Sequence, residues 1–233
     1  MNPPAPRRRT PRPHPVVALV AGLAFLVAAC GSAPLPTPDP TAAAPGGIPA
    51  GCPTSQPAAL GADETRTVTL ATEKGDIVIT IHGGWSPIAT GNFVALAECG
   101  FYDGVVFHRL VPGFVIQGGD GVYGRQPAID FDRVGTGGPA YRIADEPVTL
   151  AYRRGIVAMA RTPAPNSQGS QFFIVLDDSA AASLVRANTY AIMGEVTVGM
   201  DVVDEIAAMP NMGRTAGNLA MQPVSFDMTV TSP

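Results

Sequence analysis

Between Thr67 and Val230 the sequence is a succession of short apolar stretches separated by turns that are rich in glycine. Several stretches alternate apolar and polar residues, as in 67–70 and 77–81, which is typical of strands with one buried face. A domain of many short strands and few helices fits a closed barrel. The expected strands are 67–70, 77–81, 105–110, 114–117, 155–160, 171–176, 190–196 and 224–230.

Two helices complete this domain. Ser86 is a favoured N-cap residue, Pro87 suits the first helical position, and Gly100 ends the apolar stripe that follows them. The second helix is expected over Met200–Met209. We therefore predict a mainly β fold, in which a closed barrel is capped by two α-helices.

The N-terminal region has the features of an export signal. A basic cluster at residues 7–12 precedes an apolar run of 14 residues at 16–29. A membrane-spanning helix needs about 20 apolar residues, so the run has instead the size of a signal-peptide core. The sequence Val27-Ala28-Ala29-Cys30-Gly31 resembles a bacterial lipobox, in which the thiol of the cysteine accepts a diacylglyceryl group. An ordinary secretory signal with a chance cysteine is the alternative.

These features divide the chain into three parts. Residues 1–29 are interpreted as a lipoprotein signal peptide, 30–62 as a lipidated cysteine and a Pro/Ala-rich tether, and 63–233 as the folded domain. Eight of the 24 prolines lie in 31–62, and proline removes backbone donors, which favours an extended, solvated spacer. The expected location is outside the cytoplasm, with membrane contact only through the lipid on Cys30.

The charge of the chain reverses behind the signal segment. From residue 30 onward, 11 basic residues face 19 acidic ones, a net charge of −8. Such a surface repels a phosphate backbone, so no nucleic-acid partner is expected.

The residues needed for metal, nucleotide or covalent chemistry are sparse. His82 and His108 are the only histidines behind the signal segment, and no cysteine pair has metal-ligand spacing, so no metal is expected. Gly119–Gly124 has the spacing of a dinucleotide fingerprint, but no helical stripe follows it, and no cofactor is expected. Ser170 lacks a Gly-x-Ser-x-Gly elbow, which leaves a hydrolase that uses His108 as a distant alternative.

Two blocks of sequence carry most of the functional information. They are Phe107-His108-Arg109-Leu110-Val111-Pro112-Gly113-Phe114-Val115-Ile116-Gln117-Gly118-Gly119-Asp120 and Gly169-Ser170-Gln171-Phe172-Phe173. Alternation alone places Arg109 on the same strand face as Phe107, and Phe114 on the opposite face from Val115.

Between these blocks lie Gly135–Pro139 and Asp145-Glu146, and the stretches 194–196 and 199–203 follow. Together these features resemble the cyclophilin family of peptidyl-prolyl cis–trans isomerases, from about Thr67 to Val230. The resemblance implies an eight-stranded barrel closed by two helices, with a peptide groove on its outer face. It also implies isomerase activity on X–Pro bonds.

The resemblance assigns roles to individual residues. Arg109 and Gln117 are the expected catalytic residues, Arg109 as the catalytic arginine and Gln117 as a polar group that positions the peptide. Ala160 and Arg161 would contact the peptide through their backbone. Leu184 is chosen for the pocket, with Val185 as the alternative if the alignment shifts by one residue. The expected substrate-binding residues are Phe114, Val115, Ala160, Arg161, Gln171, Phe173, Leu184 and Tyr190.

The chain departs from the family pattern at several of these positions. Val115, Arg161 and Tyr190 stand where methionine, asparagine and histidine are common, and the loop 162–165 is one residue longer than in eukaryotic members. No tryptophan lies near Leu184, so tight cyclosporin binding is not expected. The catalytic arginine is kept, so activity is expected.

Cys52 and Cys99 are the cysteines that remain once Cys30 takes the lipid. Outside the cytoplasm they can form a disulfide that pins the linker to the first helix, and two free thiols are the open alternative. His108 is expected to be a neutral neighbour of the site and not a general base.

The expected partners are proline-containing polypeptide clients, and the protein is expected to be a monomer that assists the folding of exported proteins. The main alternative from another class is a cyclophilin-like module that binds proline-containing segments without turnover.

Overall fold

The computed structural model describes residues 47–187 and 189–232. The predicted signal peptide, Cys30 and the first part of the predicted tether lie outside the described residues. The helices and strands are β1 Thr65–Thr72, β2 Gly75–His82, α1 Pro87–Glu98, β3 Val105–Val111, β4 Val115–Gly118, β5 Ile156–Met159, β6 Phe172–Val175, α2 Ala181–Ala187, β7 Ile192–Val198, α3 Met200–Ala207 and β8 Ser225–Thr231. Within these residues, no helix combines the length and the apolar character that crossing a membrane requires.

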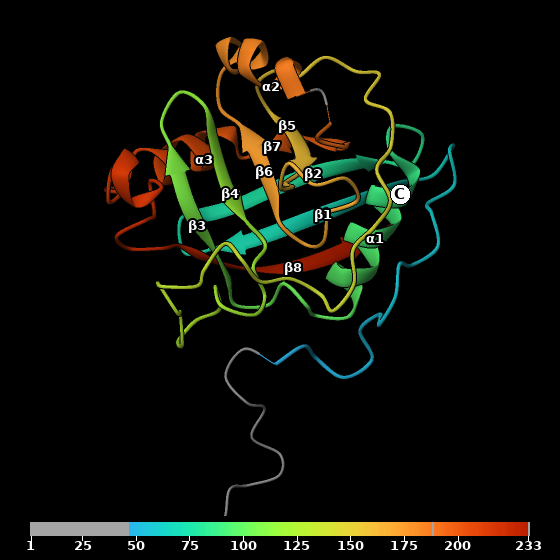
Figure 1. Cartoon of the computed structure of the whole chain (residues 1–233), viewed down its shortest axis with the longest axis horizontal. Coiled ribbons are helices and arrows are strands. Elements are labelled where there is room, and N and C mark those ends of the chain that lie inside the picture. The colour runs from blue at the N-terminus through green and yellow to red at the C-terminus, as the bar shows by residue number, and fades with distance from the viewer. Residues whose placement is uncertain (1–46, 188, 233) are drawn as a thin grey trace, which may run out of the picture. The chain divides into compact units, whose positions relative to one another are not determined.

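The eight strands form one closed antiparallel barrel in the order β1-β2-β7-β5-β6-β4-β3-β8. β1 pairs with β8 over Thr67–Thr72, which closes the sheet and leaves no free edge. This architecture confirms the predicted fold class. Figure 1 shows α1 and α3 at opposite ends of the strands. The long connection between β4 and β5 contains no helix or strand.

Apolar side chains form two separate clusters on the two faces of the barrel wall. Ile116, Phe172 and Ile174 belong to the interior cluster, in which Phe93, Tyr102, Phe107 and Phe226 add aromatic contacts. Their sequence neighbours on the same strands belong to a second cluster. Because successive strand residues point to opposite faces, the second cluster lies on the outside of the barrel. It contains Val115, Tyr152, Ile156, Ala158, Phe173, Val175, Ala180, Leu184 and Ile192.

Simple alternation along β3 gives the wrong face for Arg109. The pairing of β3 with β4 shifts register between Phe107 and Arg109, which marks a bulge at His108. A bulge adds one residue to a strand and so reverses the alternation beyond it. Phe107 therefore packs inside the barrel, while Arg109 reaches the outer face.

The capping of α1 also differs from the expectation. Ser86 occupies the N-cap position, but its side chain makes no capping hydrogen bond. The carboxylate of Glu146 takes that role from the β4–β5 connection, since it accepts hydrogen bonds from the backbone N–H groups of Ile88 and Ala89, both at 2.8 Å. A carboxylate at a helix N-terminus satisfies free donors and complements the helix dipole.

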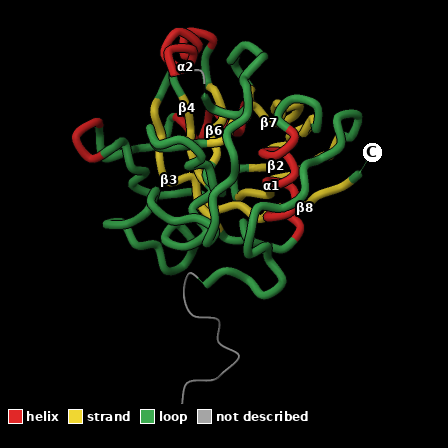
Figure 2. Tube along the Cα trace, turned by 45° about the vertical axis from the view of Figure 1, so that its right-hand side comes forward, coloured by secondary structure: helices red, strands yellow, loops and turns green. Residues whose placement is uncertain are grey.

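A third helix, α2, was not expected from the sequence. It has seven residues and buries only Leu184, so it lacks the apolar stripe that identifies a helix in sequence. A short 3-10 turn at Asp178–Ala180 precedes it, and the side chain of Asp177 accepts a hydrogen bond from the backbone N–H of Ser179 at 2.8 Å. Figures 1 and 2 both place α2 above the ends of β4 and β6.

Residues 47–62, assigned to the tether from composition, lie against the folded domain. Cys52 forms a disulfide with Cys99 at the end of α1, and the backbone N–H of Leu60 donates to the carbonyl oxygen of Pro87 at 2.9 Å. A Cβ atom at Gly91 of α1 would overlap the carbonyl oxygen of Ala58, so this helix accepts the segment only because it has a glycine there. The domain therefore begins before residue 63.

Candidate active site

One row of side chains crosses four strands on the outer face of the barrel. Arg109 of β3 pairs with Gln117 of β4, Gln117 pairs with Phe173 of β6, and Phe173 pairs with Ala158 of β5. Residues that pair directly across antiparallel strands project from the same face. The barrel register alone thus brings the predicted catalytic arginine beside the predicted glutamine and phenylalanine.

Hydrogen bonds link the polar members of this site in a chain. Nη1 of Arg109 donates to Oε1 of Gln117 at 3.3 Å, and Nε2 of Gln117 donates to Oε1 of Gln171 at 3.0 Å. Nε2 of Gln171 in turn donates to the carbonyl oxygen of Gly137 at 2.9 Å. The chain fixes both amide groups and leaves part of the guanidinium free for a ligand.

The loop after α3 holds the other side of Arg109. The carbonyl oxygen of Gly217 accepts a hydrogen bond from Nε of Arg109 at 3.2 Å. Partial burial lowers the pKa of Arg109 from its ordinary value, although an arginine stays charged at neutral pH. The site therefore presents a fixed cation at the edge of an apolar surface.

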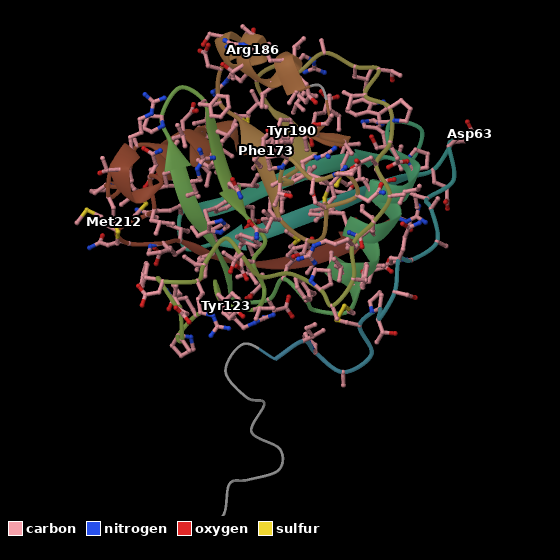
Figure 3. All side chains as sticks on the ribbon, in the orientation of Figure 1. Asp63, Tyr123, Phe173, Arg186, Tyr190 and Met212 are labelled. Carbon is pink, nitrogen blue, oxygen red and sulfur yellow. A yellow bond between two sulfur atoms is a disulfide. The ribbon has the colours of Figure 1, made fainter. Side chains whose placement is uncertain are left out.

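Beside Arg109 lies a cavity of about 170 Å³. Phe173 and Tyr190 form one wall, with ring centroids 5.4 Å apart at an interplanar angle of 85°, and Figure 3 shows these two side chains next to each other below α2. The hydroxyl of Tyr152 holds Tyr190 by donating to its carbonyl oxygen at 3.0 Å. The lining residues are Arg109, Phe114, Val115, Gln117, Ala160, Arg161, Phe173, Leu184 and Tyr190.

This cavity brings together all the predicted catalytic and binding residues except Gln171, which lines an adjoining cavity. Phe114 and Val115 both line it, although alternation predicted opposite faces, because Phe114 lies in the turn before β4 begins. Leu184 is 3% exposed and Val185 52% exposed, so the structure selects Leu184 as the pocket leucine.

The backbone contacts of Ala160 and Arg161 with a peptide stay predictions, and the structure shows which of their groups already have partners within the protein. The N–H of Ala160 already donates to the carbonyl oxygen of Gln171 at 2.8 Å, so only its carbonyl group is available to a peptide. The side chain of Arg161 is 7% exposed and forms an ion pair with Asp145 at 3.1 Å. Its Nη2 donates to the carbonyl oxygen of Ala164 at 2.8 Å, so Arg161 also holds the loop that follows it.

Sequence reasoning missed the adjoining cavity, of about 340 Å³. Its floor includes Gly135 and Gly137, whose N–H groups donate to Oδ2 of Asp120 at 2.8 and 2.9 Å. The other oxygen of Asp120 accepts from the N–H groups of Val122 and Tyr123. In the sequence, Asp120 at the end of the first block and the glycine-rich stretch 135–138 are the features that could have predicted this loop held by a buried carboxylate.

His108 and Ser170, the residues of the hydrolase alternative, are both buried. His108 is 3% exposed, and burial lowers its pKa to about 4, so it is neutral at physiological pH. The Ser170 hydroxyl is buried and donates to the carbonyl oxygen of Gly119 at 2.7 Å. A serine engaged in this way offers no support for the hydrolase alternative. In the part of the chain that the structure describes, no cluster of three or more His, Cys, Asp or Glu side chains could hold a metal ion.

Comparison with known proteins places this geometry in a family. The family model described as "Cyclophilin type peptidyl-prolyl cis-trans isomerase/CLD" matches residues 67–226. A probable peptidyl-prolyl cis-trans isomerase of Brucella abortus is 40% identical over 152 residues, which cover 64% of this chain and 74% of the relative. A peptidyl-prolyl cis-trans isomerase of Acinetobacter baylyi is 38% identical over 163 residues, which cover 68% and 81%.

Solved structures agree with this placement. A cyclophilin type peptidyl-prolyl cis-trans isomerase of Cryptosporidium parvum is 28% identical, with a TM-score of 0.60, and the match covers 72% of this chain and 99% of that one. The barrel order, the match over most of the folded domain and the curated relatives lead to one conclusion. This chain belongs to the cyclophilin family and is a peptidyl-prolyl cis–trans isomerase.

Proposed function

We propose that this isomerase acts outside the cytoplasm on X–Pro bonds of exported proteins, assists their folding, and is held at the membrane by a lipid on Cys30. The observation that carries the proposal is the disulfide between Cys52 and Cys99. Disulfides persist in oxidising compartments and are rare in the cytoplasm. The basic cluster, the apolar run and the lipobox-like Val27–Gly31 support the same location.

The spacing of Cys30 from the folded domain suits an anchored enzyme. Cys52, which the disulfide ties to α1, follows Cys30 by 22 positions. A fully extended chain of that length reaches at most about 80 Å. The site would thus work close to the membrane on segments that emerge from it, as a monomer with proline-containing polypeptides as its clients.

Arg109 is proposed to act on the reacting amide itself. Resonance gives the X–Pro bond a rotation barrier of about 18–20 kcal/mol. In the twisted transition state the proline nitrogen regains its lone pair and becomes a hydrogen-bond acceptor. A guanidinium N–H that meets this nitrogen stabilises the transition state and has little to bind in the planar ground state, which is the condition for catalysis. No bond to carbon breaks, so the step needs no nucleophile.

The other residues of the cavity are proposed to hold the substrate. Phe114, Val115, Phe173, Leu184 and Tyr190 offer an apolar wall for the proline ring. Gln117, fixed between Arg109 and Gln171, is placed to hold a carbonyl group while the other side of the bond rotates.

Cis–trans exchange of a short X–Pro peptide tests the proposed role of Arg109. The uncatalysed process takes roughly 10–100 s at 25 °C, so exchange spectroscopy by NMR detects acceleration easily. We expect the full chain to accelerate exchange and the folded Arg109→Ala variant to lose most of that acceleration. A variant that keeps full activity would remove Arg109 from the mechanism. A parent that binds the peptide without acceleration would favour the binding-module alternative.

The location is tested separately in a bacterial host. We expect intact mass analysis to find a diacylglyceryl group on Cys30, and isomerase activity to sediment with membranes. The Cys30→Ala variant should lack the lipid, and its activity should no longer sediment with membranes. Unmodified Cys30 in a soluble, cytoplasmic parent would contradict the proposed location while leaving the isomerase assignment intact.

A further inference from the structure

Three adjoining cavities on the outer face of the barrel share lining residues, and together they are called the groove. The cavity beside Arg109 and the cavity floored by Gly135 and Gly137 share Gln117, Ala160 and Arg161. A third, of about 330 Å³, is lined by Arg161, Thr162, Pro163, Ala187, Thr189 and Tyr190. A peptide whose proline occupies the first cavity therefore has the other two cavities beside its flanking residues.

The charge of this groove opposes the charge of the protein. The described domain carries 11 basic and 18 acidic residues. Yet among the described residues that line the three cavities there are three arginines, Arg109, Arg142 and Arg161, and no aspartate or glutamate. The groove is thus depleted of carboxylates on a surface where they predominate.

Two of these three arginines already have partners or a proposed role in catalysis. Arg109 occupies the reacting centre, and Arg161 is paired with Asp145 at 3.1 Å. Asp120, the carboxylate below the glycine-rich floor, is fully buried and accepts hydrogen bonds from four backbone N–H groups. These carboxylates therefore leave the charge of Arg142 uncompensated.

Arg142 is exposed at the wall of the larger cavity. Its Nη1 donates to the carbonyl oxygens of Pro139 and Tyr141, at 2.9 and 2.8 Å, which fixes the side chain. Among the described residues, no carboxylate forms an ion pair with it, whereas Arg66, Arg133, Arg153, Arg154 and Lys74 each have one. The Nε and Nη2 groups of this fixed guanidinium therefore remain available as hydrogen-bond donors.

We propose that the preferred clients of this isomerase carry an acidic residue close to the isomerising proline, and that Arg142 is the residue that selects it. The inference rests on the proposed role of the groove in binding the X–Pro segment. A carboxylate in the larger cavity would meet the free donors of Arg142 and encounter no like charge in the lining. A basic residue there would meet two guanidinium groups.

The size of the preference follows from the exposure of Arg142. Ion pairs at exposed positions change an equilibrium by about 1.4- to 5-fold, so we expect a two- to fivefold preference for an acidic over a neutral residue. Salt screens such pairs, and the preference should shrink as ionic strength rises from about 0.02 to 0.5 M.

A charge scan of a peptide tests the proposal. The probe is a blocked Ala-rich peptide with one Ala-Pro bond, in which Glu, Gln or Lys replaces each of the flanking alanines in turn. We expect kcat/KM of the full chain to rank Glu above Gln above Lys at one or two positions. The Arg142→Gln variant should bring the Glu/Gln ratio close to 1, and Arg142→Lys, which keeps the charge, should retain a ratio above 1.

Lys74→Gln is the control for the loss of one positive charge, although Lys74, unlike Arg142, is paired with Glu205 at 2.9 Å. It removes the same charge at the β1–β2 turn, and these two strands lie opposite β4 and β6 in the barrel order. This variant should keep the parent ratio. Equal rates for Glu and Gln at every position, or a ratio that survives in folded Arg142→Gln, would overturn the inference. Failure to accelerate the neutral Gln peptides at all would instead contradict the proposed function of the groove.

Discussion

The carbonyl oxygen of Gly217 accepts a hydrogen bond from Nε of Arg109 at 3.2 Å, although 108 positions separate the two residues in sequence. The backbone on either side of Arg109 is tied to the same loop, since Leu110 N–H donates to the carbonyl oxygen of Asn218 and Ala220 N–H to that of His108. With Gln117 bound at Nη1, this contact leaves the guanidinium few rotamers. The loop after α3 is therefore part of the machinery that aims the arginine.

Replacement of Gly217 by alanine should lower activity through the geometry of Arg109. Gly217 has φ +68°, a left-handed conformation that costs a non-glycine residue roughly 1–3 kcal/mol, while the space around its Cβ is open. We expect the strained loop to move the carbonyl oxygen and to reduce kcat severalfold. The Nε–Hε signal of Arg109 in NMR spectra should shift and exchange faster with solvent as the hydrogen bond weakens.

Gly51→Ala separates this effect from a general loss of stability. Gly51 also has a left-handed φ, +90°, with no atom within 4 Å of the position that a Cβ would take, and it lies outside the groove lining. We expect a similar loss in thermal stability with an unchanged kcat and Arg109 signal. Equal activity loss in both variants would contradict a positioning role for Gly217.

The buried imidazole of His108 should make the domain less stable in mild acid. Burial lowers its pKa to about 4 in the folded protein, against an ordinary value of 6.5. The unfolded chain therefore binds a proton more readily than the folded one as the pH falls from 6.5 to 4. Above pH 6.5 His108 is neutral in both states and does not lower the free energy of unfolding. Between pH 6.5 and pH 4 its protonation in the unfolded chain lowers the free energy of unfolding by about 3 kcal/mol.

Urea unfolding of the parent and of His108→Gln at pH 7.5 and pH 4.5 measures this contribution. Glutamine is neutral throughout this range, so the variant should lose less stability than the parent between the two pH values. The difference between the two proteins isolates His108 from the carboxylates, which titrate in both. Identical pH dependence in parent and variant would exclude His108 as the source.

The disulfide should stabilise the domain without affecting catalysis. Cys52 and Cys99 are 47 positions apart, and cross-links of this kind typically contribute 2–4 kcal/mol, mainly by restricting the unfolded chain. We expect the Cys52→Ser/Cys99→Ser double variant to unfold at a lower urea concentration and to keep its isomerase activity, because both cysteines lie outside the groove lining. Loss of activity at a temperature where the variant is still folded would contradict this prediction, because it would show that the disulfide influences catalysis.

The parts of this protein that the sequence predicted are those encoded in local patterns and spaced motifs. The short apolar stretches between glycine-rich turns located all eight strands, and the resemblance to the cyclophilin family assigned the residues that gather in one cavity. The face of Arg109 was predicted wrongly because a bulge at His108 interrupts the alternation. Periodicity cannot reveal a bulge, since the residues before and after it obey the pattern separately.

The remaining differences arise from contacts between distant segments. Proline-rich residues 47–62 read as a spacer, yet a disulfide and the missing side chain of Gly91 allow them to dock on α1. The ion pair between the side chain of Arg161 and Asp145 was likewise not predicted from the sequence. The cysteine count raised the Cys52–Cys99 disulfide as a possibility, but the approach of Ala58 to Gly91 and the pair Arg161–Asp145 join residues that are distant in sequence, and no local pattern predicts them.

The contact between Glu146 and the N-terminus of α1 also joins residues that are distant in sequence, and its contribution to stability can be measured. Glu146 accepts two hydrogen bonds at the start of the helix, and loss of a capping side chain typically costs about 1 kcal/mol, with a further contribution from its charge near the helix dipole. We expect Glu146→Ala to lower the free energy of unfolding by roughly 1–2 kcal/mol. Ser86→Ala should be neutral or slightly stabilising, because the Ser86 hydroxyl is buried without a hydrogen-bond partner. The reverse order in urea unfolding would restore Ser86, the residue favoured by sequence, as the cap of α1.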